Sequence, residues 1–217
     1  MRSNATGAGP GPRQIFVTRH AEKPAAGDGA VPATLGVDAI GTPNPHSLTP
    51  RGWTRAGALT VLFAPLDQRF RDGFAQPTML VAPDYGSPAE GAVHRPVQTL
   101  VPLSARLGVA VSTPTPKGQE PELVGRHLLT ATDQVVLVSW DHENIPELVA
   151  ALLGAAEVSP GPQLPADGWP DDCYDVVLSF TRQPGAGGLR YRFSELPQLL
   201  LDGDSAVPLG RRRPKMA

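Results

Sequence analysis

The sequence has only one cysteine, Cys173, among its 217 residues. A single cysteine excludes a disulfide within the chain and a CxxC zinc site. Long apolar runs are missing too, because no stretch approaches the roughly 18–20 apolar residues of a membrane span, and residues 1–12 lack the apolar core of about 7–15 residues that a signal peptide needs. We therefore expect no membrane association and a cytoplasmic location.

The sequence also lacks an excess of positive charge. It has 19 Lys and Arg against 21 Asp and Glu, with a net charge of −2. Four of the cations lie at the end of the chain, at Arg211, Arg212, Arg213 and Lys215, which leaves 15 cations against 21 acids in the rest. Since a nucleic-acid-binding domain needs a cationic face, we expect no nucleic-acid partner.

Glycine and proline are frequent, with 23 and 25 residues, yet together they stay just below the roughly 25–30% that is typical of low-complexity chains. The length fits one domain, since about 150 residues per domain is only a soft guide. We predict a flexible leader over residues 1–13, one folded domain over 14–209 and a flexible basic tail over 210–217.

Short β-favouring apolar runs alternate with segments of helical apolar spacing along the domain. The predicted strands cover residues 14–18, 79–82, 109–112, 135–139, 174–181 and 189–193, and the last two are expected to pair. The first predicted helix begins at the Thr49-Pro50 cap and runs for about four turns. The later predicted helices cover residues 96–107, 120–132 and 145–153. This alternation predicts a single α/β domain with a mostly parallel central sheet flanked by helices.

Segments rich in glycine and proline, without apolar periodicity, are the predicted loops. They cover residues 24–47, 83–93 and 159–170, and the first is long enough to act as a lid. In the first predicted helix, Arg51 and Arg55 are expected to lie on the solvated face.

Polar groups follow three of the predicted strands. Arg19 and His20 come at the end of the first strand, Arg95 lies a loop beyond the second, and His142 follows the fourth. Open parallel sheets bind ligands outside the carboxyl ends of their strands. Forked guanidinium groups match the oxygens of a phosphate ester, and a neutral imidazole can attack phosphorus. The sequence therefore predicts a pocket for a phosphate ester at this edge of the sheet.

Several segments resemble motifs of the histidine phosphatase superfamily, the group that includes the cofactor-dependent phosphoglycerate mutases. Thr18-Arg19-His20-Ala21-Glu22-Lys23 resembles the RHG or RHAE signature of this family. The other similar segments follow in the family's order: Leu48-Thr49-Pro50-Arg51-Gly52 for its LTxxG helix start, Arg95-Pro96-Val97-Gln98-Thr99 for its RxxQT phosphate-binding element, Val138-Ser139-Trp140-Asp141-His142-Glu143-Asn144 for its second-histidine segment, and Gln198-Leu199-Leu200-Leu201-Asp202-Gly203-Asp204 for a closing segment of some members. The resemblance covers most of residues 14–204 and implies a phosphoglycerate mutase-like fold.

The resemblance implies a metal-independent phosphomonoester hydrolase that works through a phosphohistidine and uses no cofactor. His20 would accept the phosphoryl group from a small phosphorylated metabolite, and water would then hydrolyse the intermediate. Arg19, Arg95 and His142 would bind the phosphoryl oxygens and stabilise charge in the transition state. For His20 to attack through one ring nitrogen, its other nitrogen must donate to a fixed acceptor, and we expect a backbone carbonyl.

The leaving oxygen needs a proton, which a carboxylic acid in a pocket usually supplies. Glu120 is the first choice, because it lies 25 positions after Arg95, where the family's general acid is commonly found. Asp141 and Glu143 flank His142 and are the alternatives.

Two departures from the family's pattern leave other functions open. The segment before Arg95 reads Gly91-Ala92-Val93-His94, without the serine that members often have, and the bulky Trp140 stands where small residues often precede the second histidine. We expect Trp140 and Asp141 to contact the substrate. The alternative functions are a phosphomutase and a phosphate-binding domain of the same fold without catalysis. The sequence does not predict the oligomeric state.

Overall fold

The described part of the chain contains one mixed sheet of seven strands. The computed structural model describes residues 11–25, 27, 33–86, 94–166, 168–185 and 188–212. The strands are β1 (Gln14–Arg19), β2 (Met79–Val81), β3 (Val111–Ser112), β4 (Val135–Trp140), β5 (Glu157–Ser159), β6 (Val176–Arg182) and β7 (Arg190–Pro197). Their order across the sheet is β3-β2-β4-β1-β6-β7-β5.

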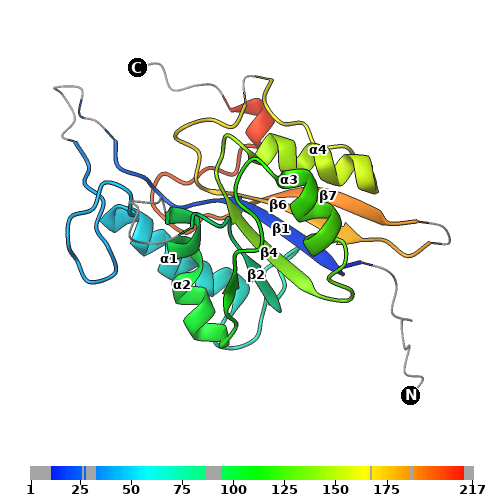
Figure 1. Cartoon of the computed structure of the whole chain (residues 1–217), viewed down its shortest axis with the longest axis horizontal. Helices are drawn as coiled ribbons and strands as arrows, with labels where there is room; N and C mark the ends of the chain where they lie inside the picture. Colours follow the sequence, from blue (N-terminus) through cyan, green and yellow to red (C-terminus); the bar gives the residue numbers. More distant parts are fainter. Residues whose placement is uncertain are drawn as a thin grey trace.

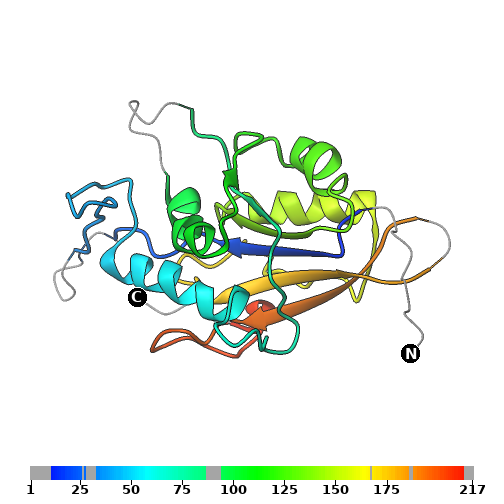
Figure 2. The same ribbon diagram turned by 90° about the horizontal axis from the view of Figure 1, so that it is seen from below.

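Most neighbouring strands are parallel. β3, β2, β4 and β1 run in one direction, and β5 is parallel to β7. β6 lies antiparallel to both β1 and β7, and β6 and β7 form a long ribbon (Figure 2). The predicted α/β class, the mostly parallel sheet and the pairing of the last two predicted strands are confirmed.

Helices cover both faces of the sheet (Figure 1). α1 (Pro50–Phe63) and α2 (Arg95–Leu107) pack on one face. α3 (Glu120–Glu122), the π-helix η2 that continues it (Leu123–Leu128) and α4 (Ile145–Ala155) cover the other face. A 3-10 helix, η3 (Leu209–Arg211), lies near the end of the described chain.

Alternating side chains along β1 divide the core between the two helical layers. Phe16 packs in a cluster with Leu59 of α1 and Leu100 of α2, whereas Ile15 and Val17 belong to the cluster that contains α4. All six residues of β1 are buried. A strand covered on both faces has no solvent side, which explains why the centre of β1, residues 15–17, is apolar without alternation.

The start of α1 follows the predicted cap. The Thr49 hydroxyl accepts a hydrogen bond from the backbone N–H of Gly52 at 3.1 Å, and Pro50 occupies the first helical position. This cap satisfies an N–H that the first turn leaves without an intrahelical partner.

Two elements differ from the sequence-based prediction. β5 is not among the predicted strands, because its three residues are stabilised by pairing with the distant β7 rather than by a local pattern. The predicted helix over 120–132 is one α-helical turn followed by η2, where the N–H of Leu129 bonds back to the carbonyl of Val124 at 3.0 Å. Apolar spacing cannot separate an α-helix from a short π-helix.

Both described ends of the chain pack against the sheet beyond the predicted domain limits of 14 and 209. The Tyr191 hydroxyl donates to the carbonyl of Pro12 at 3.1 Å, and Arg212 pairs with Asp175. The rest of the predicted leader and tail, residues 1–10 and 213–217, lies outside the described residues, as does the 91–93 part of the segment before Arg95. No helix in the described ranges combines the length and the apolar character needed to cross a membrane.

Candidate active site

The two histidines singled out in the sequence meet at the carboxyl edge of the parallel strands. Arg19 and Trp140 are register partners at the ends of β1 and β4, so the residues that follow them emerge side by side. The backbone N–H of His20 donates to the carbonyl of Trp140 at 3.0 Å. The rings of His20 and His142 lie 6.3 Å apart between centroids, nearly perpendicular at 86°.

His20 is held as a neutral imidazole with one free nitrogen. Its Nδ1 lies 2.7 Å from the carbonyl of Ala21, an oxygen that can only accept, so Nδ1 carries the proton and Nε2 carries the lone pair. The backbone carbonyl expected as the acceptor is thus confirmed. Burial, together with the charges of Arg19 and Arg95, lowers the pKa of His20 to about 3, although the hydrogen bond to Ala21 acts to raise it. At neutral pH this ring is therefore uncharged.

Asp141 is the carboxylate beside His20. Its Oδ1 lies 3.8 Å from Nε2 of His20, and its Oδ2 accepts a hydrogen bond from the Tyr85 hydroxyl. Burial raises the pKa of Tyr85, and the neighbouring Asp141 charge raises it further, so the phenol keeps its proton and remains a donor. Tyr85 therefore fixes one oxygen of Asp141 while the other faces Nε2 of His20.

Glu120, the first choice for the general acid, lies elsewhere. At the start of α3 its Oε1 accepts from the indole N–H of Trp140 at 2.9 Å and from the backbone N–H of Gly118 at 3.0 Å. Its Oε2 is buried without a hydrogen-bond partner among the described residues. The structure thus brings Asp141, and not Glu120, next to His20.

Trp140, expected to contact the substrate, is fully buried in the core. Its ring packs in the cluster that contains Leu123 and Ile145, and its only polar atom is bonded to Glu120. The bulky residue before the second histidine is therefore a packing residue under α3 and α4. Glu143, the remaining carboxylate candidate, is exposed.

Arg19 is fully buried and anchors the segment that faces the histidines. Its Nη1 donates to the carbonyls of Pro170 at 3.0 Å, Asp171 at 2.7 Å and Cys173 at 3.3 Å, and its guanidinium carbon lies 3.9 Å from the centroid of the Tyr174 ring. Its Nε is buried without a partner among the described residues. Burial lowers the pKa of Arg19, although the ordinary value is so high that the group remains a cation.

Arg95, at the start of α2, lies against the predicted lid. Its Nη2 donates to the carbonyl of Pro45 at 2.8 Å and its Nε to that of Ser47 at 3.3 Å. Thr99, one turn further along α2, accepts from the backbone N–H of Ala21 at 2.9 Å. The RxxQT segment thus joins the loop, α2 and the chain that follows β1.

His142 contacts Asp171, which also pairs with Lys23, and sequence analysis singled out neither of these two residues. Its Nε2 lies 2.8 Å from Oδ1 of Asp171, and the same oxygen lies 3.2 Å from Nζ of Lys23. Nδ1 of His142 is buried without a partner among the described residues. Burial lowers the pKa of His142, as do the charges of Arg19 and Lys23, whereas Asp171 raises it.

Lys23 stands in the RHAE segment and could have been noticed there. Asp171 lies in a loop without a pattern and gave no signal.

A cavity of about 820 Å³ opens at His142. Lys23, Glu143, Trp169 and Asp171 are among the residues that line it. This volume is far larger than a phosphate ion, so the cavity has room for the rest of a phosphate ester.

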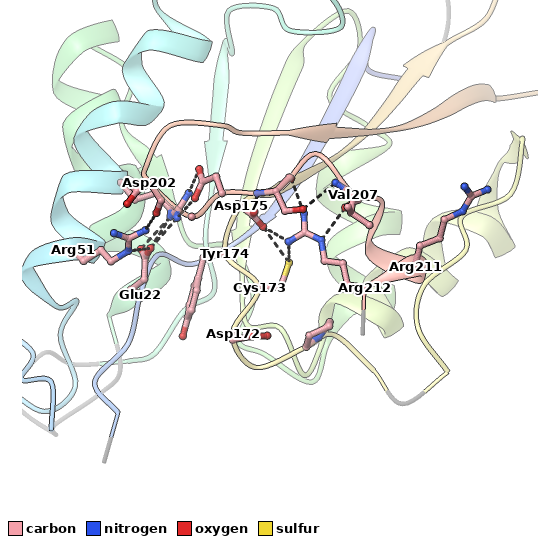
Figure 3. Close-up of a pocket in the computed structure, with 15 residues that line it drawn as sticks. Glu22, Arg51, Asp172, Cys173, Tyr174, Asp175, Asp202, Val207, Arg211 and Arg212 are labelled. Carbon is pink, nitrogen blue, oxygen red and sulfur yellow. Dashed lines mark hydrogen bonds and ion pairs between the residues drawn. The ribbon is translucent and has the colours of Figure 1, made fainter. Parts of the chain in front are cut away.

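A second cavity, of about 700 Å³, shares Asp172 and Arg212 with the first, and its other charged side chains are different (Figure 3). Figure 3 shows Arg51 beside Glu22 at one end of it and Arg212 beside Asp175 at the other. Neither of the paired histidines lines this cavity.

A buried ion-pair network lies behind the signature segment. Arg55 is almost fully buried and bonds Glu22 at 2.9 Å and Asp204 at 2.8 Å. The expectation that Arg55 lies on the solvated face of α1 is wrong, because two carboxylates and the Gln198 side chain surround its guanidinium group. Burial alone would lower the pKa of Arg55, but the hydrogen bonds to Asp204 and Glu22 raise it overall.

The fold and the site define an α/β protein with two histidines and two arginines at the carboxyl edge of its parallel strands. No protein-family model matches the sequence, and a search of curated proteins finds no significant match. Among the described residues, no three His, Cys, Asp or Glu side chains are grouped so that they could hold a metal ion.

Proposed function

We propose that the protein is a phosphomonoester hydrolase of the histidine phosphatase type, with a phosphoglycerate mutase-like fold. The observation that carries the proposal is His20 itself, a buried neutral imidazole whose Nδ1 is fixed by a carbonyl and whose Nε2 faces Asp141. An uncharged, oriented nitrogen beside cationic groups is what nucleophilic attack on an anionic ester requires.

In the first step Nε2 of His20 attacks phosphorus, and the bond from phosphorus to the ester oxygen breaks. The leaving oxygen takes a proton from the carboxyl group of Asp141, the carboxyl closest to the nucleophile. A bound phosphoryl dianion favours a protonated neighbour, since two negative charges repel. Tyr85 would hold the Asp141 carboxyl group in orientation during this transfer.

In the second step water attacks the phosphohistidine. Asp141, now a carboxylate, takes the proton from the water, and the bond from phosphorus to nitrogen breaks to release phosphate and neutral His20. Arg95 and His142 would contact the phosphoryl oxygens, and the buried charge of Arg19 would stabilise negative charge in both transition states.

Turnover of an aryl phosphate in the presence of excess chelator tests the proposal. The wild-type chain should release phosphate, and H20A should lose at least about a thousandfold in kcat, because the nucleophile is gone. Wild-type protein quenched in alkaline denaturant should carry a phosphate that is stable in base and labile in acid, and H20A should not. Full retention of the rate by H20A would defeat the proposal.

The role of Asp141 has its own test. D141N should lose about a hundredfold or more with an alkyl phosphate, whose leaving oxygen needs a proton, and much less with a nitrophenyl phosphate, whose leaving group is stable as an anion. The comparison variant is E120Q, which should show no such dependence on the leaving group. A leaving-group dependence in E120Q instead of D141N would return the general acid to Glu120.

The alternatives make different predictions in the same assays. A phosphomutase would transfer the phosphoryl group between two hydroxyls of an acceptor faster than it releases free phosphate. A binding domain without catalysis would bind phosphate and release no product from any ester in a panel.

A further inference from the structure

The carboxylate of Asp171 occupies a small site made of proton donors. Its Oδ1 lies 2.8 Å from Nε2 of His142, 3.2 Å from Nζ of Lys23 and 3.9 Å from Nη2 of Arg19. Arg19 ends β1, and Lys23 and His142 lie in the segments that follow β1 and β4, at the edge of the sheet where the proposed chemistry takes place. In the free protein the oxyanion in this site is the carboxylate of Asp171.

The carboxylate is far more exposed than the groups that hold it. The side chain of Asp171 is 79% exposed, against 32% for Lys23 and 10% for His142. The main chain of Asp171 is fixed independently, because its carbonyl accepts from Nη1 of the buried Arg19 at 2.7 Å. The Asp171 side chain can therefore rotate to another staggered position while the loop stays in place.

We propose that Lys23 is a substrate-binding cation. In the free protein the carboxylate of Asp171 occupies the site beside Lys23 and His142, and an oxyanion of the substrate displaces it on binding. The inference rests on the proposed function, since it assigns the displaced site to the phosphorylated substrate. The incoming oxyanion would take over the donors Nζ of Lys23 and Nε2 of His142. The exposed ion pair costs little to break, because such pairs contribute little net stability in water.

The cavity next to this site supports the direction of the exchange. Lys23, His142 and Asp171 all line the cavity of about 820 Å³, so a ligand in the cavity meets the donors and the carboxylate together. Asp171 then sets the affinity, because its negative charge competes with the ligand and repels it.

The experiment is calorimetric titration of the full chain with inorganic phosphate. D171N should bind phosphate about three- to tenfold more tightly than the wild type, because the competing charge is removed and the amide has nearly the same shape. K23M should bind it about three- to tenfold more weakly, and K23R should retain most of the affinity. D171A is a second variant that removes the carboxylate without leaving an amide donor, and it should also bind more tightly.

The matched control is E147Q, which removes one negative charge from the exposed side of α4. It should leave the phosphate affinity unchanged, so that a change in net charge alone is not mistaken for the effect at Asp171. Unchanged or weaker binding in both D171N and D171A would overturn the proposal, as would full affinity in K23M. These affinities are measured without turnover, so a failure here is separate from a failure of the H20A assay.

Discussion

At the scale of single residues, environment gives chemically similar side chains different roles. His20 and His142 are both buried imidazoles, but one is fixed by a carbonyl that leaves Nε2 free, and the other has its Nε2 on a carboxylate. Asp141 and Glu120 are both buried carboxylates, yet Asp141 faces His20 whereas Glu120 accepts a hydrogen bond from the indole of Trp140. Residue type alone therefore could not predict which carboxylate lies beside His20.

The buried His20 should make the stability of the protein depend on pH. Its pKa is lowered to about 3 in the folded chain, whereas an ordinary histidine of the unfolded chain titrates near about 6.5. Between these values the unfolded chain binds the extra proton, so the free energy of unfolding falls as the pH drops, by about 1.4 kcal/mol per pH unit from this group. Urea unfolding of wild type and H20Q at several pH values between about 6 and 4 measures the difference in slope. Equal slopes in the two proteins would contradict the expectation.

Tyr85 should act on catalysis through Asp141. Y85F removes the hydroxyl that donates to Oδ2, so the carboxyl group loses its fixed orientation. We expect kcat for an alkyl phosphate to fall about tenfold with little change in KM, and a smaller fall for a nitrophenyl phosphate. A rise in KM with unchanged kcat would instead make Tyr85 a binding residue.

At the scale of elements, the segment 18–23 is a structural junction as well as the proposed catalytic segment. Arg55 of α1 forms an ion pair with Glu22, and its guanidinium group also pairs with Asp204 near the end of the chain. Gln198, which accepts from Arg55, also donates to the hydroxyl of Thr18 in β1 at 3.2 Å. Two of the segments that resemble the family's motifs, 18–23 and 198–204, are thus joined through Arg55 in one polar network.

Removing Arg55 from this network should lower the free energy of unfolding much more than removing an exposed arginine of α1. R55M leaves the buried carboxylate of Asp204 without its cation and leaves Glu22 with only the half-exposed Arg51, so we expect a loss of about 3–5 kcal/mol in the free energy of unfolding, measured by urea. The control is R51M, four residues earlier on the same helix, where the side chain is 52% exposed and pairs with Glu22 at 3.3 Å. R51M should lose no more than about 1 kcal/mol. Similar losses in the two variants would show that the burial of Arg55 is not the reason for the loss in the free energy of unfolding.

Much of the element order could be predicted from the sequence, because it rests on local patterns. The β1 and β4 runs, the Thr49 cap and the apolar spacing of α2 each act over a few neighbouring residues. The histidines could be predicted because each follows such a run. β5 depends on a partner more than thirty residues away, and the position of Asp171 depends on a loop, so neither leaves a pattern in the sequence.

At the scale of the whole molecule, the sheet separates two apolar cores that share its strands. One core lies under α1 and α2 and contains Leu100, and the other lies under α4 and contains Leu148. Both leucines are fully buried.

The two cores should respond independently to truncation. L100A and L148A should each lose about 2–5 kcal/mol in the free energy of unfolding, from lost burial and from the cavity left behind. Because the two side chains lie on opposite faces of the sheet, the double variant should lose the sum to within about 0.5 kcal/mol. A markedly smaller loss would mean that the faces are energetically coupled through the strands.

The sheet is bounded by very short strands on both sides. β3 has two residues and β5 has three, while the long strands β1, β4, β6 and β7 each have a neighbour on both sides. An outermost strand of this length offers few open backbone donors and acceptors to a second molecule. The architecture therefore guards the protein against strand-by-strand aggregation at high concentration.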